Sequence, residues 1–164
     1  MRTKFRLALA ILAVTVSVAS TKARAADIVG TWRMVSWIEE ETESNAVSKP
    51  FGDKPSGLIS YTADGHMMVF FADPTRKAPA APKATDAEAS ALYRTMVAYT
   101  GTYSVEADKV THNIEIAWNQ AWSGTKQQRS FELKGDALLI KTPPFISPFS
   151  GKQIVSTLAW ERIK

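Results

Sequence analysis

The segment GTWRMVS, residues 30–36, has a glycine two positions before a tryptophan and then alternates apolar with polar side chains. This alternation is typical of a half-buried strand. Near the other end of the chain, the strand-like segment LAWER ends on Arg162, whose guanidinium can stack on the Trp32 indole for about 0.5–2 kcal/mol. We therefore predict that the first and last strands meet through these two side chains, the latch, in a sheet closed into a barrel. A small closed barrel either fills with side chains or holds one small ligand.

Residues 1–25 have the pattern of a cleaved signal peptide. Three basic residues precede an apolar run over residues 7–18, and Ala23-Arg24-Ala25 forms a small-residue cleavage site. The apolar run is shorter than the roughly 18 residues that a membrane span needs, which argues against an anchor. We therefore expect a periplasmic or secreted protein whose single domain covers residues 26–164, with no integral membrane segment in the mature chain.

Loss of this segment changes the charge of the protein. The whole sequence has 20 Lys and Arg against 16 Asp and Glu, but five of the basic residues and none of the acidic ones lie within the first 25 residues. The mature chain is therefore close to neutral, which argues against a nucleic-acid partner, because basic side chains dominate such binding. The sequence has no cysteine, so no disulfide stabilises the fold; 5 Trp, 7 Phe and 4 Tyr are available for a hydrophobic core.

Side-chain alternation and turn residues predict eight strands after the signal peptide. They cover residues 31–41, 57–62, 66–72, 99–105, 109–118, 125–134, 137–142 and 152–163. Thr85 and Glu88 form a capping box, which predicts a helix from there to about residue 98, with an apolar stripe packed on the core. The expected fold is all-β, an antiparallel up-and-down barrel with this helix inserted between strands three and four.

Two hairpins set the predicted register. A three-residue turn ending on Gly65 pairs Tyr61 with Met67, and a two-residue turn at Gly135-Asp136 pairs the strands around Leu133. Strict alternation in the first strand directs four residues inward: Trp32, Met34, Ser36 and Ile38. The same alternation directs Arg33, Trp37 and Glu39 outward, unless a bulge displaces Trp37 or another element covers it. The acidic run of residues 39–43 is interpreted as a solvated strand end.

The outer face of the second hairpin is unusually apolar. Met68 and Phe70 alternate with the inward residues of their strand and should therefore face away from the barrel interior. Either the inserted helix covers them or a second subunit does, so a homodimer is one expectation.

The ordered motifs resemble the lipocalin-like proteins, and most closely a bacterial lipocalin-like domain family of unassigned function. These motifs are GTW at 30–32, YTADGHM at 61–67, GTY at 101–103, VTH at 110–112, FELKGD at 131–136 and WER at 160–162. The resemblance implies a calycin-type β-barrel and, by family analogy, a small apolar ligand. The chain departs from typical secreted lipocalins because it has no disulfides, no Thr-Asp-Tyr motif midway along the chain and a helix within the barrel sequence.

Inward-facing positions supply the candidate ligand-binding residues: Met34, Tyr61, Phe71, Tyr103, His112, Trp118, Arg129 and Phe131. Arg129 is the most informative of these, because burying a guanidinium without an anion costs several kcal/mol. The predicted inner face offers no carboxylate, so either a ligand carboxylate meets Arg129 or the side chain reaches water at a barrel mouth. His112 is interpreted either as an acid–base group or, in preference, as a hydrogen-bonded structural residue.

Other chemistries have little support in the sequence. Two histidines without cysteine make no recognisable zinc site, and neither a nucleophile elbow nor a phosphate-binding glycine loop is present, so we expect no cofactor. Three hypotheses stay open. The chain is an exported binding protein for a small hydrophobic ligand, a barrel enzyme of the isomerase or cyclase type, or a structural domain with a filled interior.

Overall fold

The computed structural model describes residues 25–164, so the predicted signal peptide lies outside the described residues except for Ala25. Ten strands in this range form one sheet: β1 (Gly30–Glu41), β2 (Val47–Ser48), β3 (Ser56–Tyr61), β4 (His66–Ala72), β5 (Met96–Glu106), β6 (Lys109–Ala117), β7 (Lys126–Lys134), β8 (Ala137–Lys141), β9 (Phe145–Ile146) and β10 (Gln153–Arg162). The helical segments are α1 (Ala25–Ile28), α2 (Asp86–Tyr93) and the 3-10 turn η1 (Gln120–Trp122).

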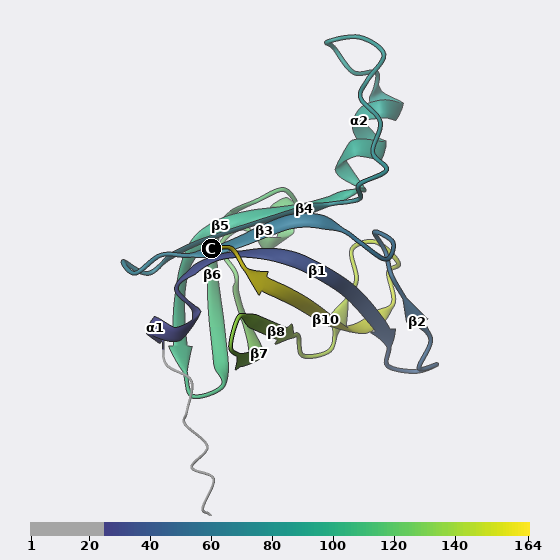
Figure 1. Cartoon of the computed structure of the whole chain (residues 1–164). Helices are drawn as coiled ribbons and strands as arrows, with labels where there is room; N and C mark the ends of the chain where they lie inside the picture. The colour runs from purple at the N-terminus through teal and green to yellow at the C-terminus, as the bar shows by residue number, and fades with distance from the viewer. Residues whose placement is uncertain (1–24) are drawn as a thin grey trace, which may run out of the picture.

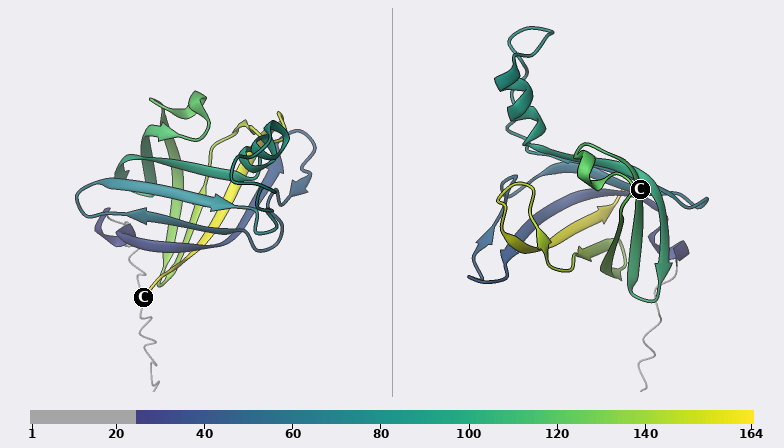
Figure 2. Two further views of the ribbon diagram at one scale, coloured as in Figure 1. Left: turned by 90° about the horizontal axis from the view of Figure 1, so that it is seen from above. Right: turned by 180° about the vertical axis from the view of Figure 1, so that it is seen from behind.

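The sheet closes because β1, near one end of the strand order, also pairs with β10, near the other end. It is antiparallel to β3 on one side and to β10 on the other, where the pairing runs from Trp32 opposite Arg162 to Glu41 opposite Ile154. The eight long strands therefore form a closed antiparallel barrel, with α2 between β4 and β5 (Figures 1 and 2). The predicted fold class is confirmed, as are both hairpin registers, Tyr61 opposite Met67 and Leu133 opposite Leu138.

One end of the barrel is closed by the latch. The Arg162 guanidinium carbon lies 4.0 Å from the centroid of the Trp32 ring, which is itself fully buried. Arg162 also donates from Nη1 to the Val29 carbonyl oxygen at 2.7 Å and from Nη2 to the Asp27 carbonyl oxygen at 2.8 Å. Gly30 has φ +135°, and a Cβ there would lie 2.7 Å from Arg162 Nη1, so this site requires glycine. The contact predicted between the first and last strands is thus present.

A β-bulge in β1 changes which residues point inward. The register against β10 shifts between Met34 and Ser36, and beyond this point Trp37 and Glu39 are buried, with 4% and 2% of their surface exposed. The predictions that Ser36 and Ile38 face inward and Glu39 faces water are therefore wrong. One extra residue on a strand reverses the alternation of every side chain that follows it.

A second bulge reverses the end of β6. Gly101 pairs with Ile114 but Thr100 pairs with Ile116, so one β6 residue is skipped. Unbroken alternation from His112 would direct Ile116 inward, but Ile116 is 68% exposed. A Cβ on Gly101 would lie 2.0 Å from the Asn113 carbonyl oxygen, so the close approach of the two strands at this bulge requires glycine.

The inserted helix is shorter than predicted and does not pack on the core. The capping box of Thr85 and Glu88 is present, but α2 ends at Tyr93 and has no buried residue. Met96 and Val97, predicted to lie in the helical stripe, instead begin β5, because pairing with β4 buries Val97 and continues the sheet. The helix and the loop before it stand away from the barrel (Figure 1).

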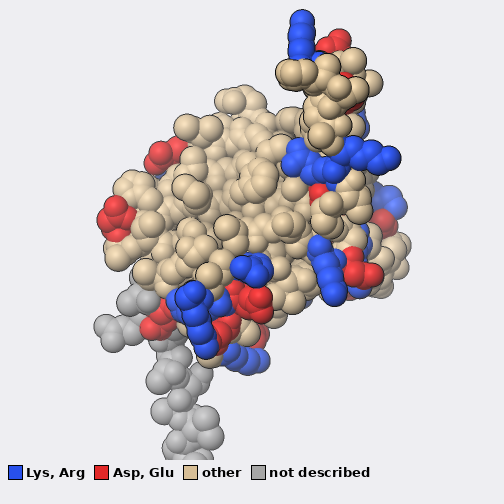
Figure 3. Space-filling view, turned by 45° about the horizontal axis from the view of Figure 1, so that its top comes forward, with Lys and Arg blue, Asp and Glu red and all other residues tan. Residues whose placement is uncertain are grey.

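The outer face of β3 and β4 is apolar and uncovered. Met68 is 62% exposed, and Leu58, Phe70 and Ile116 are exposed beside it across the sheet. Figure 3 shows this side of the barrel as a broad surface without charged side chains, bounded by Lys and Arg near the base of α2. The helix does not cover Met68 and Phe70, and a homodimer through this face stays a prediction.

We expect the substitution Arg162→Met to lower the free energy of unfolding by about 1–3 kcal/mol. It removes the ring stack and leaves the carbonyls of Asp27 and Val29 without their charged donor. Urea unfolding followed by tryptophan fluorescence measures the effect. Arg33→Met is the matched control, because Arg33 is exposed one residue from Trp32 and should change stability by no more than about 0.5 kcal/mol. Equal effects of the two substitutions would contradict the role of the latch.

Candidate ligand-binding site

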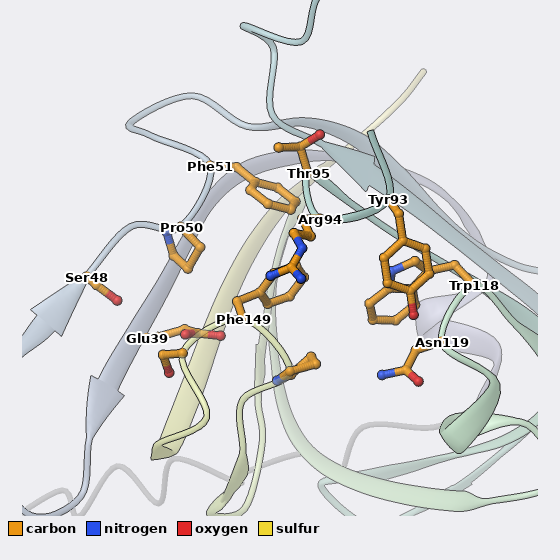
Figure 4. Close-up of a pocket in the computed structure, with 12 residues that line it drawn as sticks. Glu39, Ser48, Pro50, Phe51, Tyr93, Arg94, Thr95, Trp118, Asn119 and Phe149 are labelled. Carbon is orange, nitrogen blue, oxygen red and sulfur yellow. The ribbon is translucent and has the colours of Figure 1, made fainter. Parts of the chain in front are cut away.

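A cavity of about 410 Å³ occupies the end of the barrel opposite the latch. Its walls come from the far half of β1, the start of β5 and β7, and the segment that follows β8. A second cavity of about 400 Å³ adjoins it and shares Glu39, Pro148 and Phe149 with the first (Figure 4). Both volumes fall within the range typical of small-molecule sites.

Aromatic rings form most of the wall between the two cavities. Trp37 packs edge-on against Phe71, Phe149 and Phe51, with ring centroids 5.2, 5.5 and 4.8 Å apart. Trp122 contributes a further ring to the first cavity, where it packs against Tyr99. Flat apolar surfaces of this kind favour a ligand with an aromatic or otherwise planar body.

Arg129 is the principal polar group of the first cavity. Arg129 is 7% exposed, and its guanidinium carbon lies 5.8 Å from the centroid of the Tyr99 ring. The guanidinium donates from Nη1 to the Gln127 carbonyl oxygen at 2.9 Å and from Nη2 to Gln127 Oε1 at 2.6 Å. These partners are neutral, and no carboxylate of residues 25–164 forms an ion pair with Arg129. The cavity therefore presents a buried positive charge that lacks an anion.

His112 is held between two tyrosines in the core. Tyr61 Oη lies 2.8 Å from His112 Nε2, and Tyr99 Oη lies 3.0 Å from Nδ1. Burial, reinforced by the Arg129 charge, holds the pKa of His112 well below its usual value, and burial raises the pKa of both tyrosines. A neutral imidazole has one donor and one acceptor, so one tyrosine donates to the ring and the other accepts from it. Only Tyr99 of the three lines the cavity, so His112 has no direct contact with its interior.

The predicted ligand-binding residues divide according to their depth in the barrel. Arg129 and Phe71 line the first cavity and Trp118 the second. Met34, Tyr61, His112 and Phe131 are buried but line neither cavity, because the interior toward the latch is filled with side chains. Tyr103 lies near the β3–β4 turn, where its hydroxyl donates to the Thr62 carbonyl oxygen at 2.9 Å. Side-chain alternation predicts which residues of a strand face the barrel interior, but it does not predict how far along the barrel the cavity begins.

Glu39 is a cavity residue that the sequence interpretation placed in water. Its carboxylate lines both cavities and accepts from the Ser147 hydroxyl, with oxygen–oxygen distances of 3.4 and 3.3 Å. Burial raises the pKa of the Glu39 carboxyl, and the Ser147 hydrogen bond partly opposes this rise. The signal that could have located it was Trp37, since a tryptophan on a solvated face indicates a bulge that turns Glu39 inward as well.

Comparison with known proteins identifies the family of this chain. The profile of the lipocalin-like domain family matches residues 29–163. The chain belongs to this family. A similar protein from Aspergillus oryzae, named 4'-hydroxy-3'-methoxypropiophenone carrier protein, is 31% identical over 88 residues, which cover 48% of this chain and 78% of the carrier.

Two solved structures are also similar to this lipocalin-like chain. A lipocalin-like protein from Bacteroides uniformis is 11% identical with a TM-score of 0.44, and the match covers 84% of this chain and 99% of that one. An uncharacterized protein from Bacteroides eggerthii is 11% identical with a TM-score of 0.42, and the match covers 84% of this chain and 100% of that one.

In residues 25–164, no helix combines the length and the apolar composition that crossing a membrane requires.

We expect His112 to make the protein less stable in mild acid. Because the pKa of His112 is lowered in the fold, the unfolded chain binds a proton below about pH 6.5 that the folded chain does not. Stability should therefore fall as pH drops, by about 1.4 kcal/mol per pH unit from this residue. Urea unfolding at pH 7.5 and pH 5 measures the loss.

The control for this measurement is His112→Gln, whose amide also supplies one donor and one acceptor to the tyrosines. This variant keeps every other titrating group, including Glu39, so the difference between the two proteins isolates His112. Identical pH dependence in wild type and variant would show that His112 is not held neutral.

Proposed function

We propose that this protein binds and carries a small, largely apolar molecule in the cavity opposite the latch, with an oxygen of the ligand seated on Arg129. The observation that carries the proposal is a guanidinium, 7% exposed and without an ion-pair partner in the described chain, at the wall of a cavity that several aromatic side chains also line. Burial of such a charge is costly unless a negative or strongly polar group joins it. A ligand carboxylate or carbonyl oxygen supplies that group through charge-assisted hydrogen bonds.

The similar carrier from Aspergillus oryzae supports a binding function. Its name specifies an aromatic ketone, a class of molecule that suits both the aromatic walls and a donor aimed at an acceptor oxygen. We further propose, on the basis of the predicted signal peptide, that binding takes place in the periplasm or outside the cell. We propose no catalytic role for His112, because Tyr99 lies between it and the cavity.

Native mass spectrometry of the protein purified from its own host tests this function directly. A co-purifying small molecule with an aromatic body and an acceptor oxygen is the expected result. Protein that arrives empty, and that shows no quenching of tryptophan fluorescence by 4'-hydroxy-3'-methoxypropiophenone or by aromatic carboxylates, would rule the proposal out.

The substitution Arg129→Met should weaken binding of that molecule by about 10- to 100-fold, the range that a hydrogen bond to a charged group contributes. The readout is titration calorimetry. Lys134→Met on the same strand is the control, because Lys134 is exposed and lies at the far end of β7 from the cavity. Unchanged affinity in the Arg129 variant would exclude this residue as the anchor.

The same Arg129→Met variant should unfold at a urea concentration equal to or higher than that of the ligand-free wild type. Replacing an unpaired buried charge by an apolar side chain of similar length removes a desolvation penalty. Loss of affinity together with preserved stability is typical of a residue kept for function. A drop of more than about 1 kcal/mol would instead indicate a structural role for Arg129.

A further inference from the structure

Four polar residues form a row across the cavity wall, which we call the polar row: Arg129 on β7, Thr142 just after β8, Ser156 on β10 and Glu39 on β1. Glu39 pairs directly with Ser156, and Thr142 exchanges hydrogen bonds with the Ser156 backbone at 2.8 and 3.0 Å. The register of Ser130 opposite Lys141 places Arg129 beside Thr142. All four residues line the same cavity.

The polar row has opposite charges at its two ends. Three strand spacings of about 4.8 Å separate Arg129 from Glu39, which makes roughly 14 Å along the curved wall. The two side chains form no ion pair with one another. At one end the cavity therefore offers donors, and at the other it offers the oxygens of a carboxylate.

The oxygens of Glu39 have capacity for a further hydrogen bond. Their only donor among residues 25–164 is the Ser147 hydroxyl, at the long distances of 3.3 and 3.4 Å. The neighbouring Ser156 hydroxyl accepts from Trp37 Nε1 at 3.2 Å and forms no hydrogen bond with the Glu39 carboxylate. A carboxylate accepts through two oxygens with about four lone-pair sites, so a ligand donor can join Ser147 without displacing it.

The surroundings of Glu39 favour a neutral donor over a cation. Three cationic side chains line the two cavities with it: Arg129 and Lys126 in the first, and Arg94, which points into the second from just after α2 (Figure 4). The residues that line the two cavities therefore bring three positive charges against the one carboxylate of Glu39. A hydroxyl adds a donor without adding charge.

We propose that Glu39 is a second anchor of the site, which accepts a hydrogen bond from a hydroxyl at the end of the ligand remote from Arg129. This inference rests on the proposed function and defines its ligand class. The site selects elongated aromatic molecules that have a carboxylate or carbonyl oxygen at one end and a phenolic or alcoholic hydroxyl at the other. The rings of Phe71, Trp37 and Phe149 hold the aromatic body between the two anchors.

Two probes that differ by methylation of one oxygen test the proposal: 4-hydroxycinnamate and 4-methoxycinnamate. Both have the carboxylate for Arg129, but only the first can donate to Glu39. Calorimetric titration of the wild type should give at least a 10-fold preference for the hydroxyl probe. In Glu39→Leu this preference should disappear, through weaker binding of the hydroxyl probe and equal or tighter binding of the methoxy probe.

Matched variants make the readout specific. Glu40→Leu removes the adjacent carboxylate, which is exposed on the outside of β1, and should keep the wild-type preference. Glu39→Gln keeps an acceptor oxygen in a side chain of nearly the same shape, so it should retain part of the preference. It replaces the leucine variant if that one does not fold.

A third probe, 4-(aminomethyl)cinnamate, carries an ammonium group in place of the hydroxyl and should bind more weakly than the hydroxyl probe.

The outcomes separate this inference from the proposed function. If wild type binds the hydroxyl and methoxy probes equally well, and Arg129→Met weakens both, the second anchor is refuted while the carrier function stands. Tighter binding of the aminomethyl probe would also refute it, since Glu39 would then serve a cation. If no probe binds and no molecule co-purifies with the protein, both proposals fail together.

Discussion

The antiparallel pairing of β1 with β10 is the interaction on which the rest of the structure depends, because it turns an open sheet into an enclosed interior. Trp32 and Arg162 secure this pairing at one end, with the guanidinium 4.0 Å from the ring and bonded to two carbonyls that precede β1. That end is filled with side chains. Hollow space is therefore confined to the other end, where the pairing continues to Glu41 and Trp37 forms part of the cavity wall.

One bulge within this pairing decides the chemistry of the hollow end. Without the register shift between Met34 and Ser36, the alternation from Trp32 would direct Glu39 to solvent. With it, Trp37 becomes part of the cavity wall and Glu39 joins Ser156 on the row that ends at Arg129. A shift of one residue thus adds the Glu39 carboxylate to a cavity whose other end holds Arg129.

The buried charges of Arg129 and Glu39 destabilise the ligand-free protein, because each loses its hydration without gaining an ionic partner in the described chain. The His112 cluster shows how the same barrel treats a polar group that serves packing: each ring nitrogen has a tyrosine hydroxyl within 3.0 Å, and burial keeps the ring neutral. The contrast between a histidine with a partner for each ring nitrogen and two charges without an ionic partner is the basis on which we propose Arg129 and Glu39 as binding residues. Ligand-binding sites commonly retain residues that lower the stability of the ligand-free protein.

Sequence alone determined the closed barrel and both hairpin registers, because alternation and turn glycines are local patterns with local causes. It also supplied the indole and the guanidinium, Trp32 and Arg162, that join the first and last strands. It also singled out Arg129 as a buried cation. The tertiary structure alone decided that α2 stands apart from the core, that His112 lies behind Tyr99, and that Glu39 faces the cavity. Bulges and cavity depth depend on how neighbouring strands fit together, and no pattern within a single strand encodes that fit.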